Sequence, residues 1–305
     1  MKKLSLGCVA LAALITAPAI AADMAVKAPY RAAPPVWSWS GFYIGVNAGG
    51  GWDNNDVVET ATSSFCNPTL GGCGGPTLIS ASALAALPPG FGVKSKGFIG
   101  GGQLGYNYQT GLFVWGIEAD FDGASIKGSG NAGATVPFGA ANTVTVAGSA
   151  DKKLDFLGTV RGRLGVTPVG PLLLYATGGF AYGHVSSSTT LGESVGGPCF
   201  CGPAAGATGS ISTSRTGWAA GAGGEWAFSQ AVTVRVEWLH YDLGSASYGL
   251  SPLTQLNAAG TPFFGITTVS STSFRGDIVR AGLNWKFGGL GYGGPGYGGR
   301  GYGAY

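Results

Sequence analysis

The stretch that decides the fold is GFYIGVNAGG, residues 41–50, in which large apolar side chains alternate with small or polar ones. Phe42, Ile44 and Val46 fall on one face of an extended chain, because successive side chains of a strand point to opposite faces. Tyr43 and Asn47 fall on the other face. This period of two predicts a β-strand whose two faces meet different surroundings.

The same alternation returns along the chain. The further runs are 97–108, 112–122, 153–166, 172–185, 215–228, 232–242 and 274–287. Each has the length of a tilted strand that crosses a bilayer. A sheet in a membrane must close on itself, and an even number of strands allows the last run to pair with the first. The sequence therefore predicts an all-β fold: a transmembrane, closed, antiparallel up-and-down β-barrel of eight strands over residues 39–287.

The composition supports strands over helices. The chain has 305 residues, of which 58 are glycine and 10% are charged. Glycine costs about 1 kcal/mol per helix position relative to alanine, so a helical chain seldom holds this much of it. Mean hydropathy is +0.25, yet no apolar run after residue 21 approaches the ~20 residues of a membrane helix. The net charge of +3 without a basic cluster argues against nucleic acid as a partner.

The connections between the runs alternate in length. Residues 109–111, 167–170 and 229–231 are short turns, whereas residues 51–96, 123–152, 186–214 and 243–273 are expected to be long loops. Short turns on the periplasmic rim and long extracellular loops are typical of outer-membrane barrels. Aromatic residues near the run ends are expected to ring the two rims. On the periplasmic rim these are Trp39, Phe42, Tyr108, Phe113, Trp226, Phe228, Trp285 and Phe287.

The N-terminus predicts export. Lys2 and Lys3 precede the apolar stretch Leu4–Ile15, and the small-residue motif Pro18–Ala21 follows it. This is the pattern of a signal peptide, residues 1–21, cleaved after Ala21. Residues 22–38 then read as a Pro/Ala-rich periplasmic linker and residues 288–305 as a Gly/Tyr-rich tail. The predicted location is the outer membrane.

Four cysteines remain after cleavage: Cys66, Cys73, Cys199 and Cys201. An even number in an exported chain favours disulfides in the loops. A bond between Cys199 and Cys201 would close a very tight ring, so pairing of these two with Cys66 and Cys73 is preferred. Metal binding and free thiols remain alternatives.

The inward face of the predicted barrel is charged. Its members are Glu118, Asp120, Asp155, Arg161, Arg163, Glu225, Arg235, Glu237, Arg280 and Lys286. Side chains can fill the interior of an eight-stranded barrel, and charges buried there must pair. The preferred interpretation is a polar network that plugs and stiffens the barrel. The alternative is a narrow, gated pore lined by the same residues.

No enzymatic constellation is expected. Of the two histidines, His240 shares a strand face with Asp242, and His184 ends another run. A hydrolase would need histidine, a carboxylate and a serine together. We predict no enzyme activity, no cofactor and no metal site. Residues 77–87 of the first long loop are apolar enough to fold back over the barrel mouth.

Several stretches resemble the small outer-membrane surface-antigen barrels of alpha-proteobacteria, relatives of the opacity-protein and OmpA-type membrane domains. The stretch WSGFYIGVNAGGGW resembles their first strand. Further similar stretches are GGGQLGYNY (100–108), GTVRGRLG (158–165), VRVEWLHYDLG (234–244) and VRAGLNWKF (279–287). The family normally ends on the aromatic residue of its last strand, whereas Phe287 is followed here by residues 288–305.

The resemblance implies a structural barrel that supports envelope integrity and presents surface loops. Family members also include porin-like channels, adhesins and haem binders, which remain alternatives. The implied partners are outer-membrane lipid with lipopolysaccharide and the barrel-assembly machinery. Peptidoglycan is a further implied partner, because some relatives are attached to it through a mature N-terminus beginning Ala-Asp, as in Ala22-Asp23. The alternative is a periplasmic N-terminal tail without this role.

Overall fold

The computed structural model describes residues 37–70, 79–139, 141–198, 205–257 and 259–287. Most of these residues lie in β-strands, and α1 (Ile79–Ala86) is the one α-helix among them. No helix in this part of the chain has the length and apolar character needed to cross a membrane. The fold is therefore all-β, as the sequence predicts.

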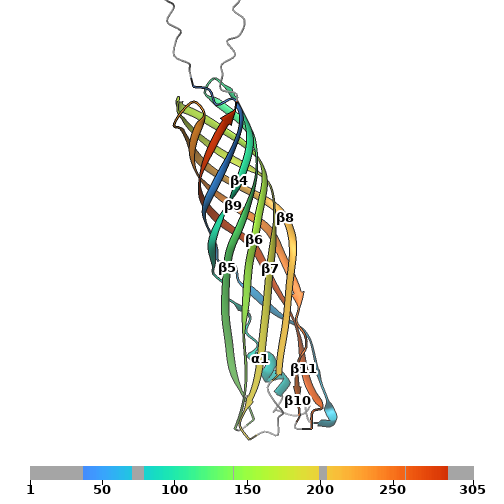
Figure 1. Cartoon of the computed structure of the whole chain (residues 1–305). Coiled ribbons are helices and arrows are strands. Elements are labelled where there is room, and N and C mark those ends of the chain that lie inside the picture. Colours follow the sequence, from blue (N-terminus) through green and yellow to red (C-terminus); the bar gives the residue numbers. More distant parts are fainter. Residues whose placement is uncertain (1–36, 71–78, 140, 199–204, 258, 288–305) are drawn as a thin grey trace, which may run out of the picture. The chain divides into compact units, whose positions relative to one another are not determined.

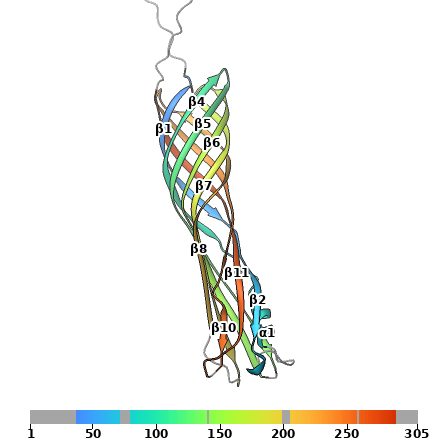
Figure 2. The ribbon, with the colours of Figure 1, turned by 90° about the vertical axis from the view of Figure 1, so that its right-hand side faces the viewer.

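Eight long strands form an antiparallel ring (Figures 1 and 2). In ring order they are β1 (Gly41–Asp53), β4 (Ser95–Thr110), β5 (Phe113–Phe138), β6 (Asn142–Val169), β7 (Leu172–Gly196), β8 (Ala205–Ala227), β9 (Val232–Gly249) and β11 (Pro262–Phe287). Each strand pairs with the next, and β11 also pairs with β1, with Phe287 opposite Phe42. The predicted ring of eight antiparallel strands is confirmed.

Tight turns join the strands at one end of the ring. They lie between β4 and β5, between β6 and β7, and between β8 and β9, where the sequence predicts them. Gly111 in the first of these turns has a φ of 61°. This left-handed conformation is one that glycine adopts without steric cost.

At the other end the strands are longer than predicted. β5 runs on to Phe138 and β6 begins at Asn142, so most of the expected loop over 123–152 is strand. Likewise, β7 extends to Gly196 and β8 begins at Ala205. The cause is visible in stretches such as Thr143–Val146, whose small polar and apolar residues alternate as those of a strand do.

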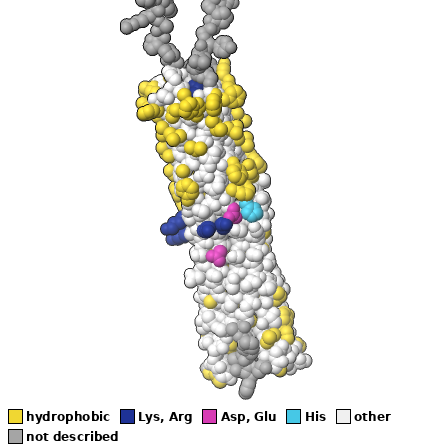
Figure 3. All heavy atoms as spheres, viewed as in Figure 1, with side chains coloured by type: hydrophobic (Ala, Val, Ile, Leu, Met, Phe, Trp, Pro, Cys, Tyr) yellow, Lys and Arg dark blue, Asp and Glu magenta, His cyan; other side chains and the backbone are white. Residues whose placement is uncertain are grey.

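The ring has two sections with opposite patterns. The turn-side section lies between the tight turns and a row formed by Lys96, Lys127 and Lys153, which are paired across β4, β5 and β6. The loop-side section lies beyond that row. Hydrophobic side chains cover the turn-side section and are sparse on the loop-side section in the view of Figure 3. Inside, the order is reversed: the interior is charged in the turn-side section, whereas Val144 is fully buried in the loop-side section.

A β-bulge in β6 shifts the side chains between the two sections. Leu154 pairs with Val185 but Phe156 pairs with His184, so β6 holds one residue more than β7 here. A bulge exchanges the faces of the residues on either side of it. Leu154, expected outside, therefore lies inside with 4% exposure. Asp155, expected inside, lies outside and pairs with Lys153; the prediction of both positions was wrong.

The chain between β1 and β4 closes the loop-side section. β2 (Val57–Cys66) pairs with β11 beyond the end of β1, and β3 (Gly90–Phe91) pairs with β2. The 3₁₀ turn η1 (Pro68–Leu70) follows β2, and β10 (Leu253–Leu256) pairs with β11. Helix α1 packs against inward-facing residues, with Ala83 and Ala86 fully buried. This packing agrees with the expectation for residues 77–87 in their described part.

Candidate functional site: the interior of the ring

The interior is filled by successive layers of side chains. Nearest the tight turns is a turn-end cluster of Trp39, Val114, Leu173 and Tyr175. Next comes a charged layer of Glu118, Asp120, Asp122, Arg161, Arg163, Glu225, Arg235, Glu237 and Arg280. Above it lies an apolar layer of Ile99, Ile126, Leu154, Leu157, Ala181, Val185, Ala219, Leu239, Tyr241, Leu243, Ala246, Phe274 and Ile278. The outer cluster, which includes Val144, Val146, Leu191 and Phe264, packs around α1.

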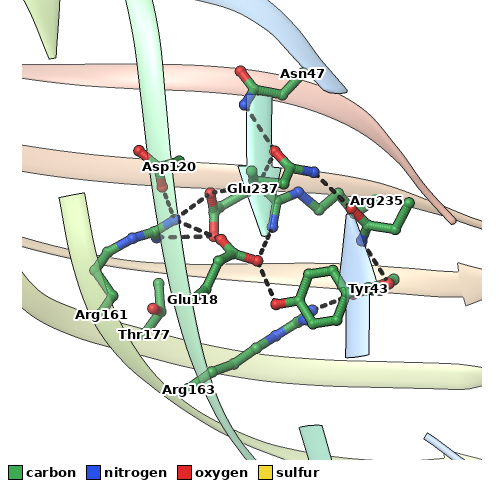
Figure 4. Close-up of polar contacts among 12 residues, drawn as sticks. Tyr43, Asn47, Glu118, Asp120, Arg161, Arg163, Thr177, Arg235 and Glu237 are labelled. Carbon is green, nitrogen blue, oxygen red and sulfur yellow. Dashed lines mark hydrogen bonds and ion pairs between the residues drawn. The ribbon is translucent and has the colours of Figure 1, made fainter. Parts of the chain in front are cut away.

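Arg161 on β6 contacts three carboxylates of the charged layer (Figure 4). Its Nη2 lies 2.8 Å from Glu118 Oε1 and 2.7 Å from Asp120 Oδ2, and its Nη1 lies 3.1 Å from Glu237 Oε1. The Arg161 side chain is fully buried. One guanidinium thus joins carboxylates of β5 and β9 across the interior.

Two further arginines extend the same network. Arg280 lies 3.0 Å from Asp120 and 2.7 Å from Glu237, and it also pairs with Asp122. Arg235 donates to Glu118 and, at 2.7 Å, to the amide oxygen of Gln103. Because Glu118, Asp120 and Glu237 each meet arginines from different strands, the network connects β5, β6, β9 and β11.

Arg163 and Glu225 form a neighbouring pair. Arg163 donates to Glu225, and its guanidinium lies 3.5 Å from the centre of the Tyr175 ring. Glu225 also accepts a hydrogen bond of 2.8 Å from the Asn284 amide. Tyr43 completes the layer by donating its hydroxyl to Glu118 at 2.6 Å. The layer compensates most of its own charge, because its four arginines face five carboxylates.

The sequence places these side chains on the inward face but does not find all of them. Asp122 shares the face of Glu118 and Asp120 by the period of two, yet it is missing from the predicted network. Tyr43 and Gln103 are also partners that the prediction lacks. Lys286 lies apart at the turn end, where it donates to the Ser38 carbonyl.

Trp39 is a correction to the predicted aromatic rim. It is 2% exposed and packs inside the turn-end cluster. Its backbone amide donates to Gln109 at 2.8 Å, and its ring meets that of Trp37 edge-on with 5.4 Å between centroids. These contacts, which the sequence does not reveal, keep the indole of Trp39 inside the strand ring and away from the outer face. The other seven residues of that predicted rim include Phe42 and Phe228, which are exposed.

The loop-side interior holds acids in apolar surroundings. Glu59 accepts a hydrogen bond from Ser270, and burial raises the pKa of its carboxyl. Burial also raises the pKa of Glu193 to about 7. Within the part of the chain that the structure describes, neither carboxylate oxygen of Glu193 has a hydrogen-bond partner. Tyr248 lies in the same section and shares hydrogen bonds of 2.9 Å with Ser187 and 2.8 Å with Thr189.

The histidines lie on the outer surface and do not share partners. His240 meets Asp277, with 3.0 Å between Nδ1 and Oδ1, rather than Asp242 of its own strand. His184 lies 2.9 Å from Ser212 and 3.3 Å from Ser214. Among the hydrogen bonds of the described residues, His240 has a carboxylate partner and His184 has serine partners. Neither histidine has both. The same residues contain no cluster of three or more potential metal ligands.

The remaining predicted sites are only partly described. Cys66 is disulfide-bonded. Cys73, Cys199, Cys201 and Ala22 lie outside the described residues. The cross-pairing of the cysteines and the attachment of peptidoglycan at Ala22 therefore stay predictions.

An antiparallel ring of eight strands with an apolar outer belt and a charged interior defines a β-barrel of the outer-membrane type. The family model for the outer membrane protein beta-barrel domain matches residues 8–287. The chain belongs to this family, and the predicted outer-membrane location is confirmed.

Individual relatives agree with the family. The 31 kDa outer-membrane immunogenic protein of Brucella melitensis is 35% identical over 282 residues, which cover 91% of this chain and 97% of that protein. The 22 kDa outer membrane protein of Rhizobium leguminosarum is 30% identical over 49% of this chain and 56% of its own length. These relatives confirm the resemblance to alpha-proteobacterial surface antigens. Among solved structures, OprG of Pseudomonas aeruginosa matches 83% of this chain and 99% of its own, with 11% identity and a TM-score of 0.38.

Proposed function

We propose that the protein is a non-conducting structural barrel that stiffens the outer membrane and presents its loop-side section to the outside. The observation that carries this proposal is the apolar layer above the charged layer. Leu157, Leu239 and Ile278 come from three different strands and are each 0% exposed. An ion would have to shed its water to pass such a layer, which costs far more than thermal energy.

The charged layer supports the same role. Its carboxylates and guanidinium groups are buried and paired with one another, as in Arg161, which is 1% exposed. Ion pairs between strands of opposite sides of the ring act as cross-braces. A pore lining would instead keep its charges in contact with water.

Surface presentation follows from the two ends of the ring. Outer-membrane barrels keep short turns on the periplasmic side, so we place the tight turns there and the loop-side section outside the cell. The polar outer face of that section suits water rather than lipid. The names of the Brucella relatives, which describe them as immunogenic, support exposure of this part.

Conductance in planar bilayers tests the scaffold. We expect no reproducible current steps from the wild type, nor from Arg161→Ala or Glu118→Ala, once heat-modifiable gel migration has verified that each protein is folded. Steps that change size between the wild type and these variants would establish a lumen-lined channel instead and overturn the proposal.

Epitope insertion tests the orientation. An epitope placed between Phe138 and Asn142, in the loop-side turn, is expected to bind antibody on intact cells. The same epitope between Ala227 and Val232, in a tight turn, is expected to bind only after the outer membrane is permeabilised. The reverse result would contradict the assigned orientation.

A further inference from the structure

The row that divides the two sections has an unusual charge pattern. Lys96 on β4 is paired with Lys127 on β5, and Lys127 is paired with Lys153 on β6. All three side chains point outward, and Lys153 is 42% exposed. Like charges directly opposite each other across neighbouring strands destabilise a sheet. Such a row is expected where an anion from outside the chain offsets the repulsion.

Carboxylates of the described residues offset part of the row's charge. Asp151 lines a hollow together with Lys127 and Lys153. Asp155 pairs with Lys153. Among the described residues, Lys96 and Lys127 form no ion pair. The row therefore leaves two adjacent cations without a carboxylate partner at the border of the apolar belt.

A hollow rich in hydroxyl groups adjoins the row on its loop side. It has a volume of about 540 Å³. Its lining includes Lys127, Lys153, Asp151, Ser129, Ser186, Ser188, Ser210 and Ser212. Ser186 continues the lysine row itself, because it is the pairing partner of Lys153. Serine hydroxyls beside lysines suit a phosphorylated sugar, whose hydroxyl and phosphate oxygens need both kinds of partner.

An apolar groove lies on the turn side of the row. It has a volume of about 930 Å³, and its lining includes Ile44, Val46, Leu104, Phe121 and Tyr182. Gly102 lies at its floor, between Val46 of β1 and Phe121 of β5 in the pairing. A missing side chain between two bulky ones leaves a furrow that acyl chains can enter.

The groove, the lysine row and the hollow all include residues of β5 and β6. Figure 3 shows Lys and Arg side chains at the border between the hydrophobic belt and the polar section. Phe98 lies two residues from Lys96 on the same outward face. Aromatic belts mark the headgroup level of a membrane. The order of acyl groove, cations and hydroxyl hollow matches the order of acyl chains, phosphate and sugar in a glycolipid.

We propose that this face binds a phosphorylated glycolipid of the outer leaflet. Lys96, Lys127 and Lys153 hold its phosphate, the serine-lined hollow holds its sugar, and the furrow at Gly102 takes an acyl chain. The inference rests on the proposed orientation, because the loop-side section must face the outside for this lipid to reach the row.

Binding in detergent micelles tests the site without depending on orientation. The probe is an acylated glucosamine disaccharide with two phosphates, and bound lipid is counted by native mass spectrometry. We expect the triple variant Lys96→Gln, Lys127→Gln, Lys153→Gln to bind about tenfold more weakly, since each exposed charge contact contributes up to about 1 kcal/mol. Arg275→Gln, which removes an exposed cation on β11 outside the site, is expected to leave binding unchanged.

A second pair of variants tests the furrow. A Cβ atom at Gly102 meets only the Gly45 carbonyl oxygen, at 3.7 Å, so Gly102→Leu fills the furrow without a clash. Gly162 on β6 has the same surroundings, with the Gly178 carbonyl oxygen at 3.8 Å, and lies outside the furrow. We expect Gly102→Leu to weaken binding of the glycolipid and Gly162→Leu to leave it unchanged.

The outcomes separate the possibilities. Equal binding by the triple lysine variant and the wild type overturns the proposal, as does equal binding of the same glycolipid without its phosphates. If phosphatidylglycerol binds as tightly as the glycolipid, the face recognises anionic lipid in general and the sugar assignment is wrong. Failure of the epitope experiment alone would instead reject the orientation while the micelle result stands.

Discussion

The turn-side and loop-side sections use the same strands and the same period of two with opposite contents. In the turn-side section Leu104 is 62% exposed, while Arg161 is 1% exposed. In the loop-side section Leu191 is fully buried, while its neighbour Thr190 is exposed. Along the strands, the large apolar side chains thus change from the outward to the inward face at the level where the apolar belt ends.

The difference shows that the solvent outside, rather than the backbone, decides which face of a strand is apolar. Against lipid, large apolar side chains lie outside and polar groups must find partners within. Against water, apolar side chains such as Val144 and Leu191 lie inside and form a hydrophobic cluster with α1. The bulge at Asp155 lets β6 change its inward face at this border while its hydrogen bonds to β7 continue on both sides.

The largest expected effect lies in the charged layer. Glu237→Ala removes a carboxylate that faces Arg161, Arg235 and Arg280. Breaking a buried pair leaves charges without partners, so we expect a loss of about 3–5 kcal/mol in the free energy of unfolding. Urea unfolding in detergent micelles, followed by gel migration, measures it.

The matched control for this variant is Asp155→Ala. Asp155 also belongs to an ion pair, but its side chain is 32% exposed. An exposed pair contributes at most about 1 kcal/mol. Equal losses in the two variants would contradict the view that the charged layer braces the ring.

A charge placed on the outer face tests the lipid contact of each section. Leu104→Arg puts a cation in the apolar belt, where it is expected to cost about 2–4 kcal/mol. Thr190→Arg puts the same side chain on the loop-side surface, where we expect less than about 0.5 kcal/mol. Unfolding of both variants in lipid bilayers gives the comparison, and a neutral Leu104→Arg would place the belt outside the membrane.

The smallest predicted effect is a pH dependence in the loop-side section. Burial raises the pKa of Glu193 to about 7 from an ordinary value of 4.5. The folded chain therefore holds a proton that the unfolded chain has released between these values. The free energy of unfolding is expected to fall as pH rises through this window and to stay low above it.

Glu193→Gln removes the titrating carboxyl group. We expect the variant to be more stable than the wild type at pH 8, by about 1–3 kcal/mol, and to differ little from it at pH 4. Urea unfolding at both pH values measures the difference. A slope between pH 4 and pH 8 that is equal in the two proteins would show that other groups cause it.

The turn-side section follows from the sequence because lipid demands a strong signal. Runs such as residues 112–122 alternate large apolar residues with carboxylates, as expected for a strand between lipid and a polar barrel interior. The loop-side strands escaped prediction because many of their outward residues are serine, threonine and glycine, which are also common in loops. Thr143–Val146 alternates correctly but resembles a polar loop in composition.

The candidate site divides in the same way. The period of two places Glu118 and Arg161 on the inward face, yet it cannot say which acid meets which arginine across the ring. Asp155 was misplaced because the alternation of Leu154, Asp155 and Phe156 continues through the bulge unchanged. A bulge is set by the pairing of neighbouring strands, which leaves no mark in one strand's own pattern.

The position of α1 constrains the order in which the ring assembles. The pairing of Phe42 with Phe287 joins the strands that lie farthest apart in the chain, and contacts of this kind carry the largest loop-closure entropy. The segment that contains α1 enters the ring beside this seam, because β2 pairs with β11 next to β1. We therefore expect the pairing of β1 with β11 and the docking of α1 to be coupled late steps of folding. A chain whose helix has not docked is expected to remain an open sheet.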